Sequence, residues 1–235
     1  MPRKRPDDRF DHLVEAATRA FIVNGGFRRT SIEDVARELG VAKGTVYLYV
    51  ESKEALFDVC LRRADATTPF PVPALPVPTP APEATLAFVR DLIGGASLFG
   101  ALDALLADDE GRDPRDELAQ IVDELYRALS DHRVKLRLIN ASAADLPELG
   151  ALWFGAARGG LNRRLAAYLS RRSTAGALRP MPDPACAARL VTETVYWFAV
   201  NRAFDPGPDR LDDEFARETV RTALLRTFLP CEHAA

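Results

Sequence analysis

The chain has 235 residues, is 47% hydrophobic and 28% charged, and carries a formal net charge of −3. This length allows a small domain together with one larger hydrophobic core. A slightly acidic chain is not a general nucleic-acid coat, which needs a strongly positive surface. No apolar run is long enough to cross a bilayer and no signal peptide is recognisable, so we expect a cytoplasmic protein that binds no membrane.

Reactive side chains are too scattered to form a catalytic or metal site. The sequence contains no HExxH, no GxSxG and no phosphate-binding glycine loop. Its cysteines and histidines lie far apart, without CxxC or Cys/His spacing: Cys60, Cys186, Cys231, His12, His132 and His233. We therefore predict that the chain is not an enzyme and binds no metal ion and no cofactor.

The first predicted element is a long amphipathic helix that ends at the turn residues 24–26. Its apolar residues recur at i, i+3, i+4, i+7, i+10 and i+11, which places them on one helix face. They are Phe10, Leu13, Val14, Ala17, Ala20 and Phe21.

Residues 30–50 have the pattern of two short helices joined at a glycine. Thr30 and Glu33 have the spacing of a capping box, which predicts the start of the first helix. Gly40 ends that helix, because glycine adopts a left-handed backbone at little cost. The first helix buries Ile32, Val35, Ala36 and Leu39. The second, roughly 42–50, buries Val46 with Val50 or Tyr49 and exposes Lys43, Gly44, Thr45, Tyr47 and Leu48.

A fourth helix follows Ser52, which is a good N-cap. Its apolar face contains Leu56, Val59 and Cys60. The helix over roughly 42–50 is short, has little apolar surface and would be unstable alone. The long helix before residue 24 and the helix after Ser52 are therefore needed to stabilise it. Together the elements predict a helix-turn-helix, which presents its second helix to the major groove of DNA. The alternative is a plain four-helix bundle with solvated charges.

Four segments in this region resemble the TetR family of transcriptional regulators, namely residues 20–27, 30–36, 40–49 and 52–57. The resemblance runs from about residue 10 to 60; beyond it, only size and helical pattern are similar. It implies an all-helical homodimer, usually a repressor, that binds a palindromic double-stranded DNA operator and is released by a small-molecule effector. Motif positions that commonly touch the operator are occupied by Thr30, Lys43, Thr45, Tyr47, Tyr49 and Lys53. Leu48 and Val50 depart from the residues usual in the family.

The side chains at these positions also suit DNA on chemical grounds. Lys43 and Lys53 each neutralise a phosphate and release counterions. The missing Cβ of Gly44 lets the helix approach closely, and the hydroxyls of Thr45 and Tyr47 fix its register on the backbone. We therefore expect the second helix to hold phosphates better than it distinguishes bases.

Leu48 and Tyr49, in the same predicted helix, differ from these phosphate-binding residues. Leu48 is suited to contact with a thymine methyl group. Tyr49 either contacts DNA or packs into the small core. The charge distribution agrees with a DNA-binding region, because residues 1–53 contain 10 Lys and Arg against 8 Asp and Glu although the whole chain is acidic. The predicted DNA-binding set is Thr30, Lys43, Gly44, Thr45, Tyr47, Leu48, Tyr49 and Lys53.

Seven prolines occur between residues 69 and 82. Such a run cannot be helical and favours extended polyproline II geometry. It predicts a stiff linker over residues 67–82, between a helix-turn-helix domain with its connecting fourth helix (1–66) and a helical ligand-binding and dimerisation domain (83–235). The alternative for the linker is a docking site for a polyproline-binding domain.

The remaining sequence is again helical, so the predicted fold is all-α, with an N-terminal three-helix helix-turn-helix head and a C-terminal helical bundle. Breaks are predicted at Gly94-Gly95, Gly100 and Ser130-Asp131. Helices are also predicted from Pro147 to Leu169, after Pro184 and over 211–229. The last two have broad apolar faces, which favours a four-helix dimer interface; burial within one subunit is the alternative.

Aromatic and polar residues of the C-terminal part suit an apolar ligand cavity with a few polar anchors. The predicted ligand-binding set is Phe99, Tyr126, Trp153, Phe154, Arg158, Glu193 and Trp197. Each aromatic residue is also explained as ordinary core. A helical small-molecule-binding protein or a helical enzyme without specific DNA binding is the alternative function.

Overall fold

The computed structural model describes residues 6–66, 71–94, 100–107, 112–207 and 211–230. Within these ranges every regular element is a helix, apart from a single bridge between Val50 and Val77. The predicted all-α fold is therefore confirmed. The chain divides into a head unit, Met1–Ile93 with Val134–Phe154, and a bundle unit, Gly94–Arg133 with Gly155–Ala235. The head unit thus extends beyond residue 66, where the first domain was predicted to end.

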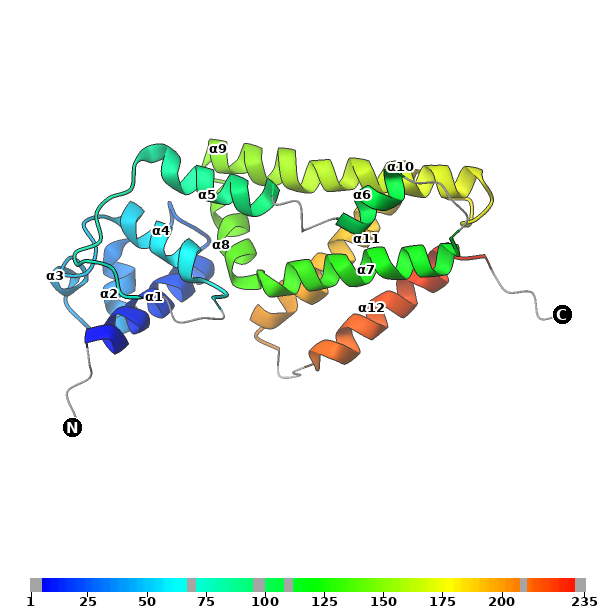
Figure 1. Cartoon of the computed structure of the whole chain (residues 1–235). Helices are drawn as coiled ribbons and strands as arrows, with labels where there is room; N and C mark the ends of the chain where they lie inside the picture. Colours follow the sequence, from blue (N-terminus) through cyan, green and yellow to red (C-terminus); the bar gives the residue numbers. More distant parts are fainter. Residues whose placement is uncertain (1–5, 67–70, 95–99, 108–111, 208–210, 231–235) are drawn as a thin grey trace. The chain divides into compact units, whose positions relative to one another are not determined.

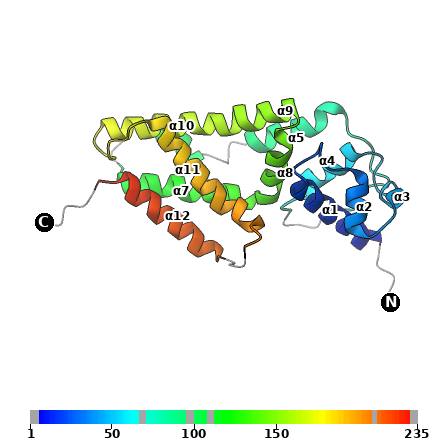
Figure 2. The ribbon, with the colours of Figure 1, turned by 180° about the vertical axis from the view of Figure 1, so that it is seen from behind.

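Four helices open the head unit (Figure 1): α1 (Pro6–Val23), α2 (Ile32–Leu39), α3 (Lys43–Val46) and α4 (Lys53–Arg63). The six predicted core residues of α1 are all buried, and α1 packs against both α2 and α4. Figure 2 shows the same three helices together from behind. Ser52 caps α4 by accepting the Ala55 N–H at 3.1 Å. The helix-turn-helix and its supporting helices are present as predicted.

The start of α2 differs from the prediction by one residue. Its N-cap is Ser31, whose hydroxyl oxygen accepts the Asp34 N–H at 3.2 Å, while Asp34 accepts the Ser31 N–H at 2.9 Å. Thr30 is not the cap because its hydroxyl is buried and donates to the Gly26 carbonyl at 2.9 Å. The predicted pairing of Thr30 with Glu33 was therefore wrong, and the capping box lies one position later.

Helix α3 is a single turn, shorter than the predicted 42–50. Residues 47–49 continue as turns, and the backbone then pairs with the proline-rich segment. The Val77 N–H donates to the Tyr49 carbonyl at 2.8 Å, and the Glu51 N–H donates to the Val77 carbonyl at 3.0 Å. These bonds thus follow the turn over residues 47–49, and the chain leaves the helical path at Val50, which bridges to Val77.

The described part of the proline-rich segment contains no helix, as predicted. We call residues 71–81 the strap. Beyond its pairing through Val77, the strap contacts the start of α4, because the Thr79 hydroxyl donates to the Ser52 hydroxyl at 2.8 Å. It leads into α5 (Pro82–Gly94). The strap is therefore bonded to the segment between α3 and α4 through Val77 and Thr79.

Helices α8 (Arg133–Ala143) and α9 (Pro147–Gly150) complete the head unit. Asp65, with a left-handed φ of 57°, accepts the Val134 and Lys135 N–H groups at 3.1 and 2.9 Å, which caps α8 from the end of α4. At Gly26, φ is 112° and an added Cβ would lie 2.3 Å from the Ala141 carbonyl oxygen. Only glycine fits this approach to α8.

The bundle unit is centred on α11 (Pro184–Ala199), which packs against α7 (Pro114–Asp131), α10 (Gly159–Thr174) and α12 (Asp213–Phe228). Helix α6 (Gly100–Ala107) contacts α7 and α10, and a 3-10 turn (Asn201–Phe204) follows α11. Breaks were predicted at Gly94-Gly95, Gly100 and Ser130-Asp131: α5 ends at Gly94, α6 begins at Gly100 and α7 ends at Asp131, while Gly95 lies outside the described residues. The stretch from Pro147 to Leu169 is helical as predicted, but its middle, Ala151–Arg158, is a π-helix.

Candidate functional site

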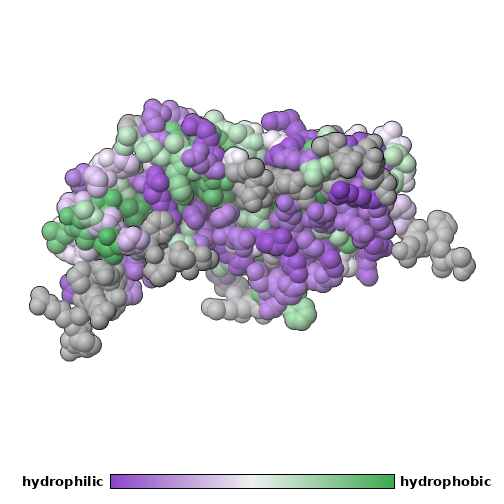
Figure 3. Space-filling model, viewed as in Figure 1, coloured by the Kyte–Doolittle hydropathy of each residue, from purple (hydrophilic) through white to green (hydrophobic). Residues whose placement is uncertain are grey.

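The exposed surface of the helix-turn-helix lies around α3. Val46 and Val50 are buried, whereas Lys43, Gly44, Tyr47 and Leu48 are exposed, as predicted. Figure 3 shows apolar surface at this end of the head. The exposed large hydrophobic residues next to α3 in the chain are Val41, Tyr47 and Leu48. The outward face of α3 therefore combines one cation, a bare backbone and apolar side chains.

Gly44 leaves the surface of α3 uncovered. A Cβ added at this position would meet no atom within 4 Å, so nothing inside the protein requires a glycine here. Because Gly44 has no side chain, the backbone of α3 is open to close approach by a partner molecule.

Lys43 is held at the start of α3 by an ion pair with Glu33 of α2. The hydrogen bond between the two raises the pKa of Lys43 and lowers the pKa of Glu33, so both are charged. Both side chains are about half exposed, 49% and 51%. Exposed ion pairs of this kind are weak. The ammonium is therefore positioned by Glu33 but remains free to exchange it for a phosphate.

Lys53 and Thr30 are engaged inside the head instead. The Lys53 ammonium donates to the carbonyls of Phe27 and Thr30 at 3.0 and 3.2 Å and lies 4.2 Å from the centre of the Phe27 ring. The Thr30 side chain is only 1% exposed. Through these bonds both residues hold the loop between α1 and α2, and Lys53 connects it to α4.

The two tyrosines after α3 have different surroundings. Tyr47 is 40% exposed. Tyr49 is half-buried, and its ring centre lies 6.3 Å from that of Phe10 in α1. Tyr49 thus has the core contact that its alternative interpretation required, whereas Tyr47 has room to reach a partner. Thr45 is also half-buried.

The predicted ligand-binding residues do not form one cluster. Arg158 pairs with Glu193, but the Tyr126 hydroxyl donates to Asp213 at 3.2 Å and the Trp153 indole N–H donates to Asn140 at 2.9 Å. Phe154 and Trp197 are 43% and 42% exposed, and Phe99 lies outside the described residues. Trp153 and Phe154 belong to the head unit and the other described residues of the set to the bundle unit, and their role in ligand binding stays a prediction.

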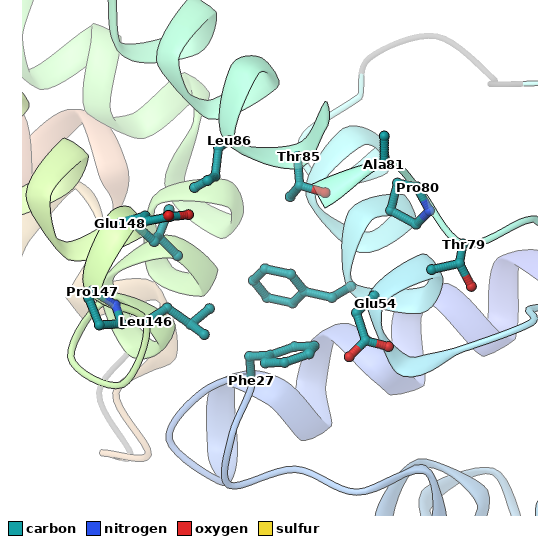
Figure 4. A pocket seen from close by; sticks show the side chains of 12 residues that line it. Phe27, Glu54, Thr79, Pro80, Ala81, Thr85, Leu86, Leu146, Pro147 and Glu148 are labelled. Atoms are coloured by element: carbon teal, nitrogen blue, oxygen red, sulfur yellow. The ribbon is translucent and has the colours of Figure 1, made fainter. Parts of the chain in front are cut away.

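Sequence reasoning missed a cavity of about 500 Å³ in the head unit (Figure 4). Five separate chain segments meet around it, so no local pattern points to it. It is lined by Phe27, Glu54, Phe57, Thr79, Pro80, Ala81, Thr85, Leu86, Leu146, Pro147, Glu148 and Leu149. None of these residues belongs to the predicted ligand-binding set.

In the described ranges, no group of three or more His, Cys, Asp or Glu side chains is arranged to hold a metal ion. None of the described helices has the length and apolar character needed to cross a bilayer. Burial raises the pKa of the Cys60 thiol to about 12, which keeps it protonated and unreactive.

Two family models match the sequence. The model described as "Bacterial regulatory proteins, tetR family" matches residues 13–60, and that described as "AefR-like transcriptional repressor, C-terminal domain" matches residues 116–231. Two curated Bacillus subtilis proteins match the head. The "Uncharacterized HTH-type transcriptional regulator YhgD" is 41% identical over 51 residues, and the "Fatty acid metabolism regulator protein" is 35% identical over 54. These matches span 22% and 23% of this chain and about a quarter, 26%, of each relative.

Solved structures match along nearly the whole chain. The ketosteroid transcriptional regulator KstR2 of Mycobacterium tuberculosis has a TM-score of 0.58 at 18% identity, covering 94% of this chain and 95% of its own. A bacterial regulatory protein of the tetR family from Rhodococcus RHA1 has a TM-score of 0.53 at 18% identity, covering 95% and 97%. At these identities the likeness concerns the fold alone.

Proposed function

The chain belongs to the TetR family of transcriptional regulators, and from that premise we propose that it is a repressor that binds a palindromic operator as a dimer and leaves it when a small molecule binds. The observation that carries the proposal is the outward face of α3. It presents a positioned ammonium on Lys43, an uncovered backbone at Gly44 and a 68% exposed Leu48. Such a face suits a phosphate-lined groove.

In the proposed complex Lys43 and the Tyr47 hydroxyl bind phosphates, which sets the position of α3. Leu48 contacts a thymine methyl group in the major groove. Thr45 and Tyr49, being half-buried, contribute through their exposed edges. Lys53 and Thr30 act indirectly by fixing the loop before α2. Sequence preference then rests on few base contacts and on the shape of the operator.

Dimer formation is proposed through the last two long helices. Leu190 and Trp197 of α11 are 52% and 42% exposed, and Phe215 of α12 is 77% exposed. Large apolar side chains exposed on neighbouring helices favour association with a second copy. A two-fold dimer also explains why two copies of α3 would read an inverted repeat.

The proposed effector site of the bundle unit is centred on one ion pair. Arg158 and Glu193 form an ion pair between the π-helix and α11, and the Arg158 guanidinium lies 5.7 Å from the centre of the Tyr196 ring. A polar pair among aromatic groups is the kind of anchor that orients a bound small molecule. This pair supports a ligand-responsive regulator.

Selection of binding sites from random DNA duplexes tests the proposed function. We expect the full-length protein to enrich an inverted repeat whose half-sites are centred about one helical turn, roughly 10 base pairs, or a multiple of it apart. Sedimentation at micromolar concentration should give the mass of a dimer. Enrichment of no sequence contradicts specific DNA binding, whereas an enriched site without repeat symmetry, bound by a monomer, contradicts the dimer.

A further inference from the structure

The cavity of the head unit is large enough for a small organic molecule. Its volume of about 500 Å³ lies within the range of ligand pockets. The strap forms one wall through Thr79, Pro80 and Ala81, while the other walls come from α4, α5, the Phe27 loop and the start of α9. Figure 4 shows these segments facing one another across the space.

The wall is mostly apolar, and its hydroxyl groups already have partners. Phe27, Phe57, Leu86, Leu146 and Leu149 supply most of the apolar surface. The Thr79 hydroxyl donates to the Ser52 hydroxyl and the Thr85 hydroxyl donates to Asp58, both at 2.8 Å. A molecule bound in the cavity therefore contacts apolar surface, and the hydroxyl groups of Thr79 and Thr85 already donate to other residues.

Two carboxylates in this lining, of Glu54 and Glu148, remain unpaired. Neither accepts a hydrogen bond or forms an ion pair anywhere in the described part of the chain. The nearest cation in sequence, Lys53, is committed to the Phe27 and Thr30 carbonyls. In Figure 4, Glu54 lies on the α4 side next to Phe27 and Glu148 lies on the opposite side, on α9. The cavity thus combines apolar walls with two exposed carboxylates, each in the first turn of its helix and neither paired with a cation of the described residues.

We propose that this cavity binds a hydrophobic organic cation. Both carboxylates belong to exposed residues, so the charge of the occupant acts on them directly: they repel an anion and leave a neutral occupant without electrostatic attraction. They attract a cation, and the face of an aromatic ring such as Phe57 adds to the attraction. Apolar groups on the same molecule fill the rest of the space.

The strap connects this site to the DNA-facing end of the head. The Thr79 N–H donates to the Glu51 carboxylate at 3.0 Å, and Val77 pairs with the backbone of Tyr49 and Glu51, directly after α3. An occupant that displaces the strap therefore also displaces residues 49–51, to which Val77 is bonded and which follow α3 in the chain. This coupling rests on the proposed function, because it requires that α3 bind DNA; occupation of the cavity does not.

Calorimetric titration without DNA tests the site with two ions of closely similar shape and opposite charge. We expect tetraphenylphosphonium to bind the wild-type protein at least about tenfold more tightly than tetraphenylborate, as two exposed carboxylates allow. In the Glu54→Gln/Glu148→Gln double variant that preference should fall to within about threefold. Equal binding of the two ions, no binding of either, or an unchanged preference in the double variant overturns the proposal.

A matched pair of strap variants tests the location. Ala81→Trp places a bulky side chain in the lining and should abolish phosphonium binding. Ala74→Trp makes the same change at an exposed strap position outside the lining and should leave it unchanged. Circular dichroism establishes that both variants are folded. Unchanged binding by Ala81→Trp, or equal loss in both variants, contradicts the location.

The coupling is tested on the selected duplex. Saturating tetraphenylphosphonium should change the wild-type affinity for DNA by about tenfold and should leave that of Ala81→Trp unchanged. An unchanged wild-type affinity overturns the coupling. If no operator is enriched from the random duplexes, the proposed function is contradicted. The calorimetric titration uses no DNA, so it still tests the cation site independently.

Discussion

Replacing Gly44 by leucine is expected to reduce the affinity for the selected duplex at least about 100-fold, towards the level of non-specific binding. The physical reason is steric. A Cβ added at Gly44 meets no atom of the protein within 4 Å, so we expect the leucine side chain to project from the exposed face of α3 into the space that the DNA must occupy. Fluorescence anisotropy with a labelled duplex measures the loss.

The stability of this variant should not fall, because leucine has a higher helix propensity than glycine and causes no internal clash. Gly94→Leu is a matched control, since Gly94 of α5 is also exposed and equally free of neighbours. It should retain wild-type DNA affinity. Wild-type affinity in Gly44→Leu, with the protein folded, would show that α3 does not enter the groove.

Replacing Arg172 by methionine is expected to lower the free energy of unfolding by about 3–5 kcal/mol, because it leaves a carboxylate buried without its partner. Arg172 of α10 pairs with Glu117 of α7, which is 1% exposed and also accepts a hydrogen bond from the Tyr168 hydroxyl at 3.2 Å. Burial raises the pKa of Tyr168 well above its usual range, so the phenol remains a donor. Urea denaturation measures the loss.

Two further variants separate the buried charge from other effects. Arg163→Met removes an exposed arginine of the same helix and should change stability by less than about 0.5 kcal/mol. In Arg172→Met/Glu117→Leu the carboxylate is removed as well, so part of the lost stability should return. If the double variant is as unstable as Arg172→Met, the cost lies in packing rather than in the uncompensated charge.

Local patterns in the sequence predicted most of the head. The stripe of α1, the end of α2 at Gly40 and the cap at Ser52 depend on residues within a turn or two of each other, and the structure contains all three. The capping box was placed one residue early because Thr30 and Ser31 are both acceptable caps by sequence. Burial of the Thr30 hydroxyl against Gly26, a tertiary contact, decides between them.

Contacts between distant segments were not predictable. The bonds of Val77 to Tyr49 and Glu51, after α3, join residues about 27 positions apart whose sequences show no pairing signal. Asp65 caps α8 from 69 positions away. The head cavity was not predictable for the same reason, since its walls come from segments that meet only in the folded chain.

The salt dependence of DNA affinity tests the central claim most directly, namely that α3 binds DNA through its phosphates. For the selected duplex, the logarithm of the binding constant should fall linearly with the logarithm of salt concentration. Lys43→Ala should make the slope shallower by about 0.9 for each phosphate that the variant no longer neutralises. A slope near zero, or one that Lys43→Ala leaves unchanged, would contradict the account.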